Sequence, residues 1–291
     1  MSEPTNEGRR RIKEMEVMVA DVVVETPDTV TLVLFTGNDR LEYKAGHFLT
    51  IDPHQFDSLE RFIAFFEDVK QKREPARAYS MSSAPHERYL AITVKEERYV
   101  SGQTKYPPLL SPLLVRGTMR GMKLVITGFT GPFTLPEDIE SRTDHLVHVC
   151  AGSGSVPNFA ILKQALLHHP KLRHTFLYSN KTWDDVIFQR DLDQLEREHP
   201  SRLRVVHTLT REDPPEQRVR RGRIDGAMLR EFIPDPDKCI VYACGPAIGP
   251  LDRKAAREKG IEPTPRFLET VLRELEELGV ASERIKRESY G

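Results

Sequence analysis

The sequence predicts two domains of the β plus α/β class, an N-terminal antiparallel β-barrel and a C-terminal parallel α/β sheet. Three observations support this prediction. Short β-branched runs separated by turns fill the first half, strand and helix patterns alternate in the second, and a glycine-rich turn joins a strand to a helix near residue 152. The chain has 291 residues, of which 38% are hydrophobic, enough for a core in each domain.

The first half begins with a polar, aperiodic stretch, residues 1–13, which predicts a mobile tail. We expect a barrel domain over 14–142, because its apolar runs are short and end at turn residues. Strands are predicted over 17–24, 30–35, 43–51, 90–95 and 123–128. The segment 136–142 is acidic and predicts a loop at the domain boundary.

One helix interrupts this series of strands, over residues 57–72. Its apolar residues recur at intervals of three and four, with charged residues between them. They are Leu59, Phe62, Ile63, Phe66 and Val69. Such a helix either packs on the barrel or serves as a lid or docking surface.

Arg77 and Tyr79 lie two residues apart on a predicted strand, so their side chains share one face. A guanidinium there can hold a phosphate while the ring covers a flat group. The plainer interpretation is a surface charge beside a half-buried aromatic residue. Further on, Ser111 followed by Pro112 predicts a helix N-cap, which is either a second anion site or a structural cap.

The second half, 143–291, alternates between strands and helices, which predicts a Rossmann-like parallel sheet covered on both faces. Strands are predicted over 145–150, 174–178, 203–208 and 239–243, and helices over 159–167, 191–198, 225–232 and 267–278. Ligands of such sheets bind at the carboxyl ends of the strands. Cys150, Ser179, Arg211 and Cys244 follow strands of this sheet.

The turn after the first of these strands has the spacing G-x-G-x-x-P, with Gly152, Gly154 and Pro157. Glycines at such a turn let backbone N–H groups approach a pyrophosphate, and the following helix directs its positive end there. A glycine pair after a strand is also an ordinary tight turn. The other motifs of the chain favour a dinucleotide site.

Composition excludes several classes of protein. Lysines and arginines number 43 and aspartates and glutamates 44, so no strong field favours nucleic acid or an anionic membrane. No apolar run reaches the ~20 residues of a membrane span. Three cysteines provide neither a disulfide framework nor an iron–sulfur cluster, and no paired C-x-x-C metal site is present. We expect a soluble protein of the reducing cytoplasm without a metal site.

Five motifs in order carry a family resemblance: R-x-Y-S at 77–80, G-P-x-T at 131–134, A-G-S-G-x-x-P at 151–157, C-G-P at 244–246, and an aromatic residue at 290. This order resembles the ferredoxin–NADP(+) reductase family. The resemblance implies an FAD-binding barrel followed by an NAD(P)-binding domain.

The resemblance also implies roles for individual residues. Arg77 would hold the flavin pyrophosphate, Tyr79 would lie on the isoalloxazine, and Ser80 would bond near flavin N5. The implied flavin contacts are Arg77, Ala78, Tyr79, Ser80, Thr93, Val94, Lys95 and Ser111; the nucleotide contacts are Gly152, Gly154, Pro157, Ser179, Lys181, Arg211, Arg223, Cys244, Gly245 and Pro246; and the catalytic set is Ser80, Cys244, Glu288 and Tyr290. Tyr290 would cover the flavin until nicotinamide displaces it. Otherwise Cys244 is a buried small residue and Tyr290 a frayed terminus.

The chain departs from the family pattern at three places. Gly102 and Ser111 are separated where the family has a glycine-rich turn and serine, the helix at 57–72 is unusual, and 250–265 is a charged insertion. Some relatives carry an iron–sulfur domain, and we expect none in this chain.

A 2′-phosphate needs cations, and relatives selective for NADPH have arginines at matching places, so the resemblance implies Lys181, Arg211 and Arg223 as contacts that favour NADP(H) over NAD(H); the alternative is a solvated charged face. The resemblance implies hydride transfer from NADPH to FAD N5, then single-electron transfer to a separate ferredoxin, another iron–sulfur protein or an oxygenase component. The alternatives are a flavin reductase and a non-catalytic flavin-binding interaction subunit.

Overall fold

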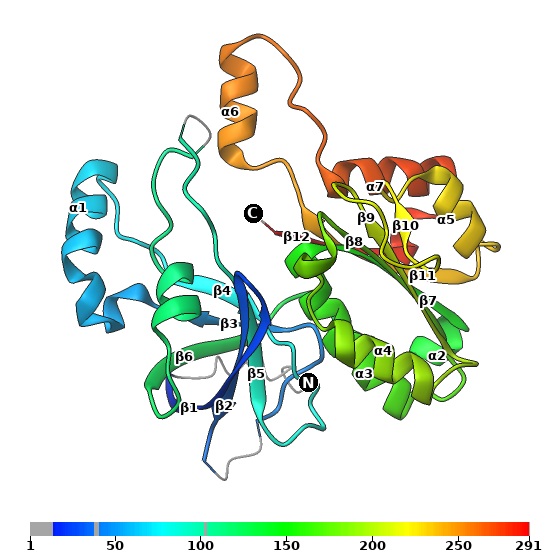
Figure 1. The fold of residues 1–291 in the computed structure, drawn as a ribbon, viewed down its shortest axis with the longest axis horizontal. Coiled ribbons are helices and arrows are strands. Elements are labelled where there is room, and N and C mark those ends of the chain that lie inside the picture. Colours follow the sequence, from blue (N-terminus) through cyan, green and yellow to red (C-terminus); the bar gives the residue numbers. More distant parts are fainter. Residues whose placement is uncertain (1–13, 38–40, 102–103, 291) are drawn as a thin grey trace, which may run out of the picture.

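The computed structural model describes residues 14–37, 41–101 and 104–290. Two sheets lie side by side, each built from a different half of the chain (Figure 1). The predicted tail 1–13 and Gly102 lie outside the described residues. The predicted boundary at residue 142 falls between the last strand of one sheet and the first strand of the other.

The first sheet is antiparallel, has six strands and curls into an open barrel. Its strands are β1 (Met15–Thr26), β2 (Thr29–Phe35), β3 (Phe48–Ile51), β4 (Arg77–Ser80), β5 (Leu90–Lys95) and β6 (Lys123–Thr130), in the order β4-β3-β6-β1-β2-β5. The edge strands β4 and β5 approach each other at an isolated bridge between Met81 and Ile92. The predicted antiparallel barrel is thus confirmed as a barrel-like sheet whose ladder does not close.

The strand predicted over 43–51 is shorter than expected, because a turn occupies its first half. Gly46 has φ +91°, and a Cβ there would lie 1.9 Å from the Phe133 carbonyl oxygen. The His47 N–H donates to the Lys44 carbonyl at 3.0 Å, and β3 begins only at Phe48. The alternation of side chains did not reveal this turn.

The inserted helix packs on the barrel. Short 3-10 turns, η1 (Pro53–Gln55) and η2 (Asp57–Leu59), lead into α1 (Glu60–Lys70), which ends at Gln71 with φ 50°. Leu59 and Ile63 join the barrel core. Phe62 is 59% exposed, so the apolar stripe of the sequence is wider than the face that the helix buries.

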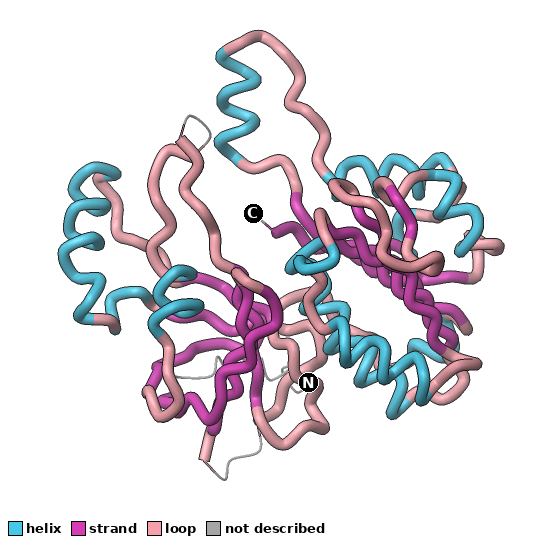
Figure 2. Tube along the Cα trace, viewed as in Figure 1, coloured by secondary structure: helices cyan, strands magenta, loops and turns pink. Residues whose placement is uncertain are grey.

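The second sheet is entirely parallel, as the strand–helix alternation predicts. Its strands are β7 (His145–Ala151), β8 (Arg173–Asn180), β9 (Leu203–Leu209), β10 (Arg220–Arg221), β11 (Cys239–Pro246) and β12 (Ile285–Tyr290), in the order β10-β9-β8-β7-β11-β12. Helices α3 (Ser155–His168) and α4 (Gln189–Glu198) cover one face, and α5 (Gly226–Phe232) and α7 (Phe267–Glu277) cover the other (Figure 2). The predicted Rossmann-like fold is confirmed.

Several helical segments of the chain differ from the prediction. The helix expected from Phe159 begins at Ser155, because Pro157 lies in its first turn, where a proline costs no hydrogen bond. The expected loop contains α2 (Ile139–Arg142), and the charged insertion contains α6 (Pro250–Glu258), which projects from the body (Figure 1). The remaining short turns are η3 (Leu113–Gly117), η4 (Gly152–Gly154), η5 (Trp183–Asp185) and η6 (Ser282–Arg284).

A row of histidines is buried between the parallel sheet and α3. The ring of His148 stacks on His174 and Phe176, with centroids 5.6 and 5.4 Å away. Its Nδ1 lies 3.0 Å from Asn158 Oδ1, and its Nε2 lies 3.4 Å from His174 Nδ1. Burial lowers the pKa of His148 to about 4, so the folded domain holds this ring neutral.

The two domains are joined by packed and charged contacts. Phe133 meets Tyr242 edge to face at 5.2 Å, and the Tyr242 hydroxyl donates to the Thr134 carbonyl at 3.0 Å. Lys163 on α3 pairs with Glu87 of the first domain at 2.5 Å. These contacts fix the walls of the space between the domains. No helix in the described part of the chain is long and apolar enough to span a bilayer.

Candidate functional site

A cavity of about 460 Å³ opens between the barrel and the edge strand β12. Residues of β4, β5 and β12 supply most of its walls. They include Arg77, Ala78, Tyr79, Ser80, Thr93, Val94, Lys95, Ser111, Glu288 and Tyr290. The structure therefore brings together every residue for which the sequence implies a flavin contact, and three of the four implied catalytic residues line the same cavity.

Two tyrosine rings line this cavity. Tyr79 lies on β4, which pairs with β3, and Tyr290 lies on β12 opposite Pro246 of β11. The Tyr290 ring packs against the apolar cluster that contains Cys244, and its hydroxyl has no hydrogen-bond partner among the described residues. Aromatic faces with an unpaired polar atom suit a flat, polar ligand.

Glu288 is a half-buried carboxylate in the same wall. The pairing of β11 with β12 sets it beside Cys244, which is fully buried and lines neither cavity of the site. Burial raises the pKa of Glu288 to about 7, and the neighbouring Ser80 hydroxyl opposes that rise. Burial also raises the pKa of Cys244 well above that of a free thiol. Glu288 can therefore gain or lose a proton near neutral pH, whereas Cys244 stays a thiol.

Ser111 lines the cavity but does not cap a helix, so the predicted N-cap is wrong. Its hydroxyl accepts the Glu97 N–H at 3.1 Å, and η3 begins without a side-chain cap. This bond joins the end of the segment that follows β5 to the start of η3. A contact between Ser111 and a flavin phosphate stays a prediction.

A second cavity of about 510 Å³ lies at the carboxyl ends of β7, β8 and β9. Gly152 lines it with φ +53°, a conformation that favours glycine. At position 154 only glycine fits for a different reason: a Cβ there would lie 2.2 Å from the Cys244 carbonyl oxygen. Gly154 and Pro157 are buried and do not line this cavity. Their contact with a nucleotide stays a prediction.

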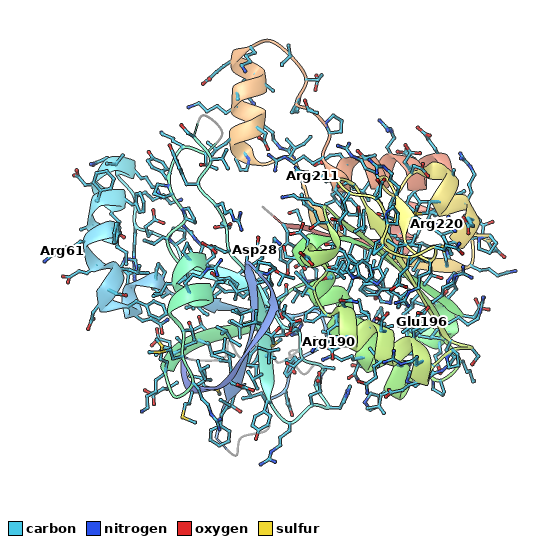
Figure 3. The ribbon with its side chains drawn as sticks, in the orientation of Figure 1. Asp28, Arg61, Arg190, Glu196, Arg211 and Arg220 are labelled. Carbon is cyan, nitrogen blue, oxygen red and sulfur yellow. The ribbon has the colours of Figure 1, made fainter. Side chains whose placement is uncertain are left out.

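Five cations line the second cavity, and three of them take part in no ion pair within the described segments. These three are Lys181, Arg211 and Arg223. Their neighbours Arg220 and Arg221 are paired, with Glu231 and Asp213 respectively. Figure 3 shows Arg211 on the part of the second domain that lies near α6 and α7. Cations without protein partners are available to a ligand phosphate.

Some residues of the site were not predicted. Asn180 lines the second cavity, is only 6% exposed, and has no described partner for either amide atom. Asp185 lines it too and accepts from Lys95 at 3.4 Å across the domain interface. Asn180 follows the predicted second strand directly, so its place at a strand end was the available signal. The Asp185 contact joins residues 90 positions apart, so no local pattern in the sequence indicated it.

The two cavities adjoin. Lys95, Ser153, Pro246 and Arg266 belong to the walls of both. Lys95 also pairs with Asp28 at 2.8 Å, which Figure 3 places on the side of the barrel that faces the second domain. Ser179 lines the second cavity, whereas Gly245 is buried and pairs with Ser289 of β12. Among the described residues, no cluster of three or more His, Cys, Asp or Glu could hold a metal ion.

Comparison with known proteins gives the class of the molecule. Residues 148–248 match the family model of the oxidoreductase NAD-binding domain. The FAD/NAD-binding domain of a nitric oxide dioxygenase from Vibrio cholerae superposes with a TM-score of 0.71 at 24% identity, covering 95% of this chain and 98% of that one. The ferredoxin–NADP+ reductase of Plasmodium falciparum gives a TM-score of 0.63 at 17% identity, covering 95% and 96%. The fold is that of two-domain nucleotide-dependent reductases.

Curated relatives agree with this class. Cytochrome b5 reductase 4 of Danio rerio is 34% identical over 130 residues, 44% of this chain, and a nitrate reductase of Volvox carteri is 27% identical over 119 residues, 40% of this chain. The matched segments span only 24% and 14% of those relatives. Residues 148–248 form an oxidoreductase NAD-binding domain, and the expected resemblance to the ferredoxin–NADP(+) reductase family is confirmed in the fold.

Proposed function

We propose that the chain is an FAD-dependent NAD(P)H oxidoreductase. It takes hydride from NADPH and passes single electrons to a separate protein acceptor. The observation that carries the proposal is the pair of adjoining cavities with four shared lining residues. One cavity presents two tyrosine rings and Arg77, and the other lies at the strand ends where parallel sheets bind nucleotides.

The residues of the first cavity suit FAD. Arg77 offers a guanidinium for phosphate, the tyrosine rings offer flat faces, and Glu288 and Tyr290 bring polar side chains to the wall. Bound FAD would supply the hydride acceptor and the one-electron chemistry that no amino-acid side chain here provides.

The residues of this chain would then orient the reactants and handle protons. Tyr290 packs over the cluster that holds Cys244, so nicotinamide must displace the ring to reach that position. Ser80 lies beside Glu288, whose Oε2 can hold a proton near neutral pH. Lys95 and Arg266 line both cavities and would fix the relative position of the two nucleotides.

The three unpaired cations support NADPH as the donor. A 2′-phosphate would meet Lys181, Arg211 or Arg223 without breaking an existing ion pair. A charge-assisted hydrogen bond contributes about 1.5–3 kcal/mol, and partial exposure reduces that value to roughly 1.4 kcal/mol, or tenfold in affinity. NADH lacks the phosphate and would gain nothing from these side chains.

The acceptor is a ferredoxin, another iron–sulfur protein or an oxygenase component. The names of similar proteins support a redox partner of this kind, among them a ferredoxin reductase of carbazole 1,9a-dioxygenase and cytochrome b5 reductases. A haem protein is the alternative acceptor that the cytochrome b5 reductases suggest.

Anaerobic rapid mixing tests the proposal. NADPH should bleach the bound flavin of the wild type, and Arg223→Gln should raise the NADPH concentration for half-maximal bleaching about tenfold, with NADH changed less than twofold. Arg220→Gln removes an arginine that is already paired with Glu231 and should have no effect. Failure of both nucleotides to bleach the flavin contradicts the enzyme proposal and favours an interaction subunit. Loss of FAD during gel filtration favours a flavin reductase.

A further inference from the structure

Glu74 is a buried carboxylate between the inserted helix and β4. Its side chain is 2% exposed and contacts two cations, Lys70 through Oε1 and Arg77 through Oε2, the latter at 2.9 Å. Its backbone N–H donates to Glu67 Oε1 at 2.8 Å. A carboxylate that is removed from water to this degree must be paired, and here both of its oxygens are engaged.

Lys70 is itself held in place. It is the last residue of α1, and its Nζ lies 4.6 Å from the ring centroid of Phe66 and 4.7 Å from that of Tyr106. The two rings meet edge to face at 5.8 Å. The inserted helix thus delivers a fixed ammonium group to Glu74, and the loop before Ser111 supplies the second ring.

Arg77 is held from one side. Its Nη2 donates to Glu74 and its Nη1 donates to the Pro75 carbonyl at 3.3 Å, while the residue lines the first cavity. A guanidinium has five N–H donors in a planar fork, so these two bonds leave the others for a ligand. The two contacts restrain the orientation of the guanidinium at the cavity wall.

We propose that Glu74 is a positioning residue for Arg77, and that the task of the inserted helix α1 is to hold this carboxylate through Lys70. The inference rests on the proposed FAD site, in which Arg77 binds the flavin pyrophosphate. A free arginine samples many rotamers, and immobilising one such side chain before binding is worth up to about tenfold in affinity. Glu74 contributes by fixing the guanidinium before the cofactor arrives.

The experiment measures dissociation constants for FAD and for riboflavin, which lacks phosphate, by quenching of flavin fluorescence in the apoprotein. Glu74→Gln should weaken FAD binding about tenfold and leave riboflavin binding unchanged. On an Arg77→Met background the same substitution should cause no further loss, because Glu74 acts through Arg77. Glu231→Gln is the matched control, since it removes the carboxylate of another arginine pair, remote from both cavities.

Three outcomes would overturn the inference: wild-type FAD affinity in Glu74→Gln, an equal loss of riboflavin binding, or a further loss on the Arg77→Met background. If near-ultraviolet circular dichroism shows that Glu74→Gln is misfolded, Lys70→Met decides by the same criteria, because it removes the ammonium group and keeps an apolar stem between the rings. A wild type that binds neither flavin contradicts the proposed function itself, which separates that failure from a failure of the Glu74 inference.

Discussion

The buried histidine row predicts that the protein loses stability in mild acid. His148 has an ordinary pKa of 6.5 in the unfolded chain and about 4 in the folded domain. The folded state excludes the imidazolium, so the contribution to stability is complete above pH 6.5 and is lost as the pH falls from 6.5 toward 4. His145 and His207 are also buried, and burial lowers the pKa of each to about 4.

The size of the effect follows from these values. Lowering the pH from 7.5 to 5.5 protonates the unfolded imidazole and leaves the folded one neutral, which costs about 1.3 kcal/mol for each histidine. Because pH 5.5 lies well above the pKa in the folded domain, the cost depends mainly on the pKa of the histidine in the unfolded chain. Three such histidines cost about 4 kcal/mol, a large part of the 5–15 kcal/mol that stabilises an ordinary protein.

Urea unfolding of flavin-saturated protein at pH 7.5 and 5.5 measures this loss. His148→Gln removes one titrating group, so the wild type should lose about 1.3 kcal/mol more than this variant between the two pH values. The exposed His168→Gln should lose as much as the wild type. The comparison uses the change in unfolding free energy between the two pH values in each protein. The packing cost of the substitution and the contribution of carboxylates that titrate in both proteins then cancel. Equal losses in wild type and His148→Gln would refute the reasoning.

Three other predictions follow from the site. Flavin reduction by the wild type should slow above pH 7, where Glu288 loses its proton, and Glu288→Gln should lack this decline; stopped-flow pH profiles test this, and the same profile in both proteins contradicts it. Gly154→Ala should destabilise the second domain by about 2–3 kcal/mol, since its Cβ would meet the backbone of Cys244, and urea unfolding measures the loss. Lys163→Met should cost about 2 kcal/mol by leaving Glu87 unpaired at the domain interface, and on a Glu87→Gln background the same substitution should cost much less; an equal cost on both backgrounds argues against the ion pair.

Much of the fold could be predicted because the apolar residues of its helices and strands recur at regular intervals. Val147 and Val149 face one side of β7 and Leu146 the other, and such buried runs between helix patterns specify a parallel sheet. The helix start at Ser155 could not be located, because glycine and proline at 152–157 indicate a turn as well as a first helical turn. The six residues of β12 were missed because three of them are charged, which hides the alternation expected of a strand.

Site residues could be predicted where they belong to a sequence motif. Arg77, Tyr79 and Ser80 line the expected cavity because a strand fixes their directions. Glu74 and Asp185 were not found, since each acts through a tertiary contact rather than a local pattern. No spacing rule reports that a carboxylate is buried between two cations.

The position of β12 at the edge of its sheet has a consequence for insertions and deletions. Glu288 and Tyr290 share one face because they are two residues apart, and their only ladder is with β11, where Glu288 faces Cys244 and Tyr290 faces Pro246. An insertion that slid this ladder by one residue would turn both side chains to the opposite face together. A change in the length of the turn at 279–284 is therefore compatible with the site only where the turn absorbs it and β12 keeps its register, whereas Arg287, on the exposed face, is free to vary.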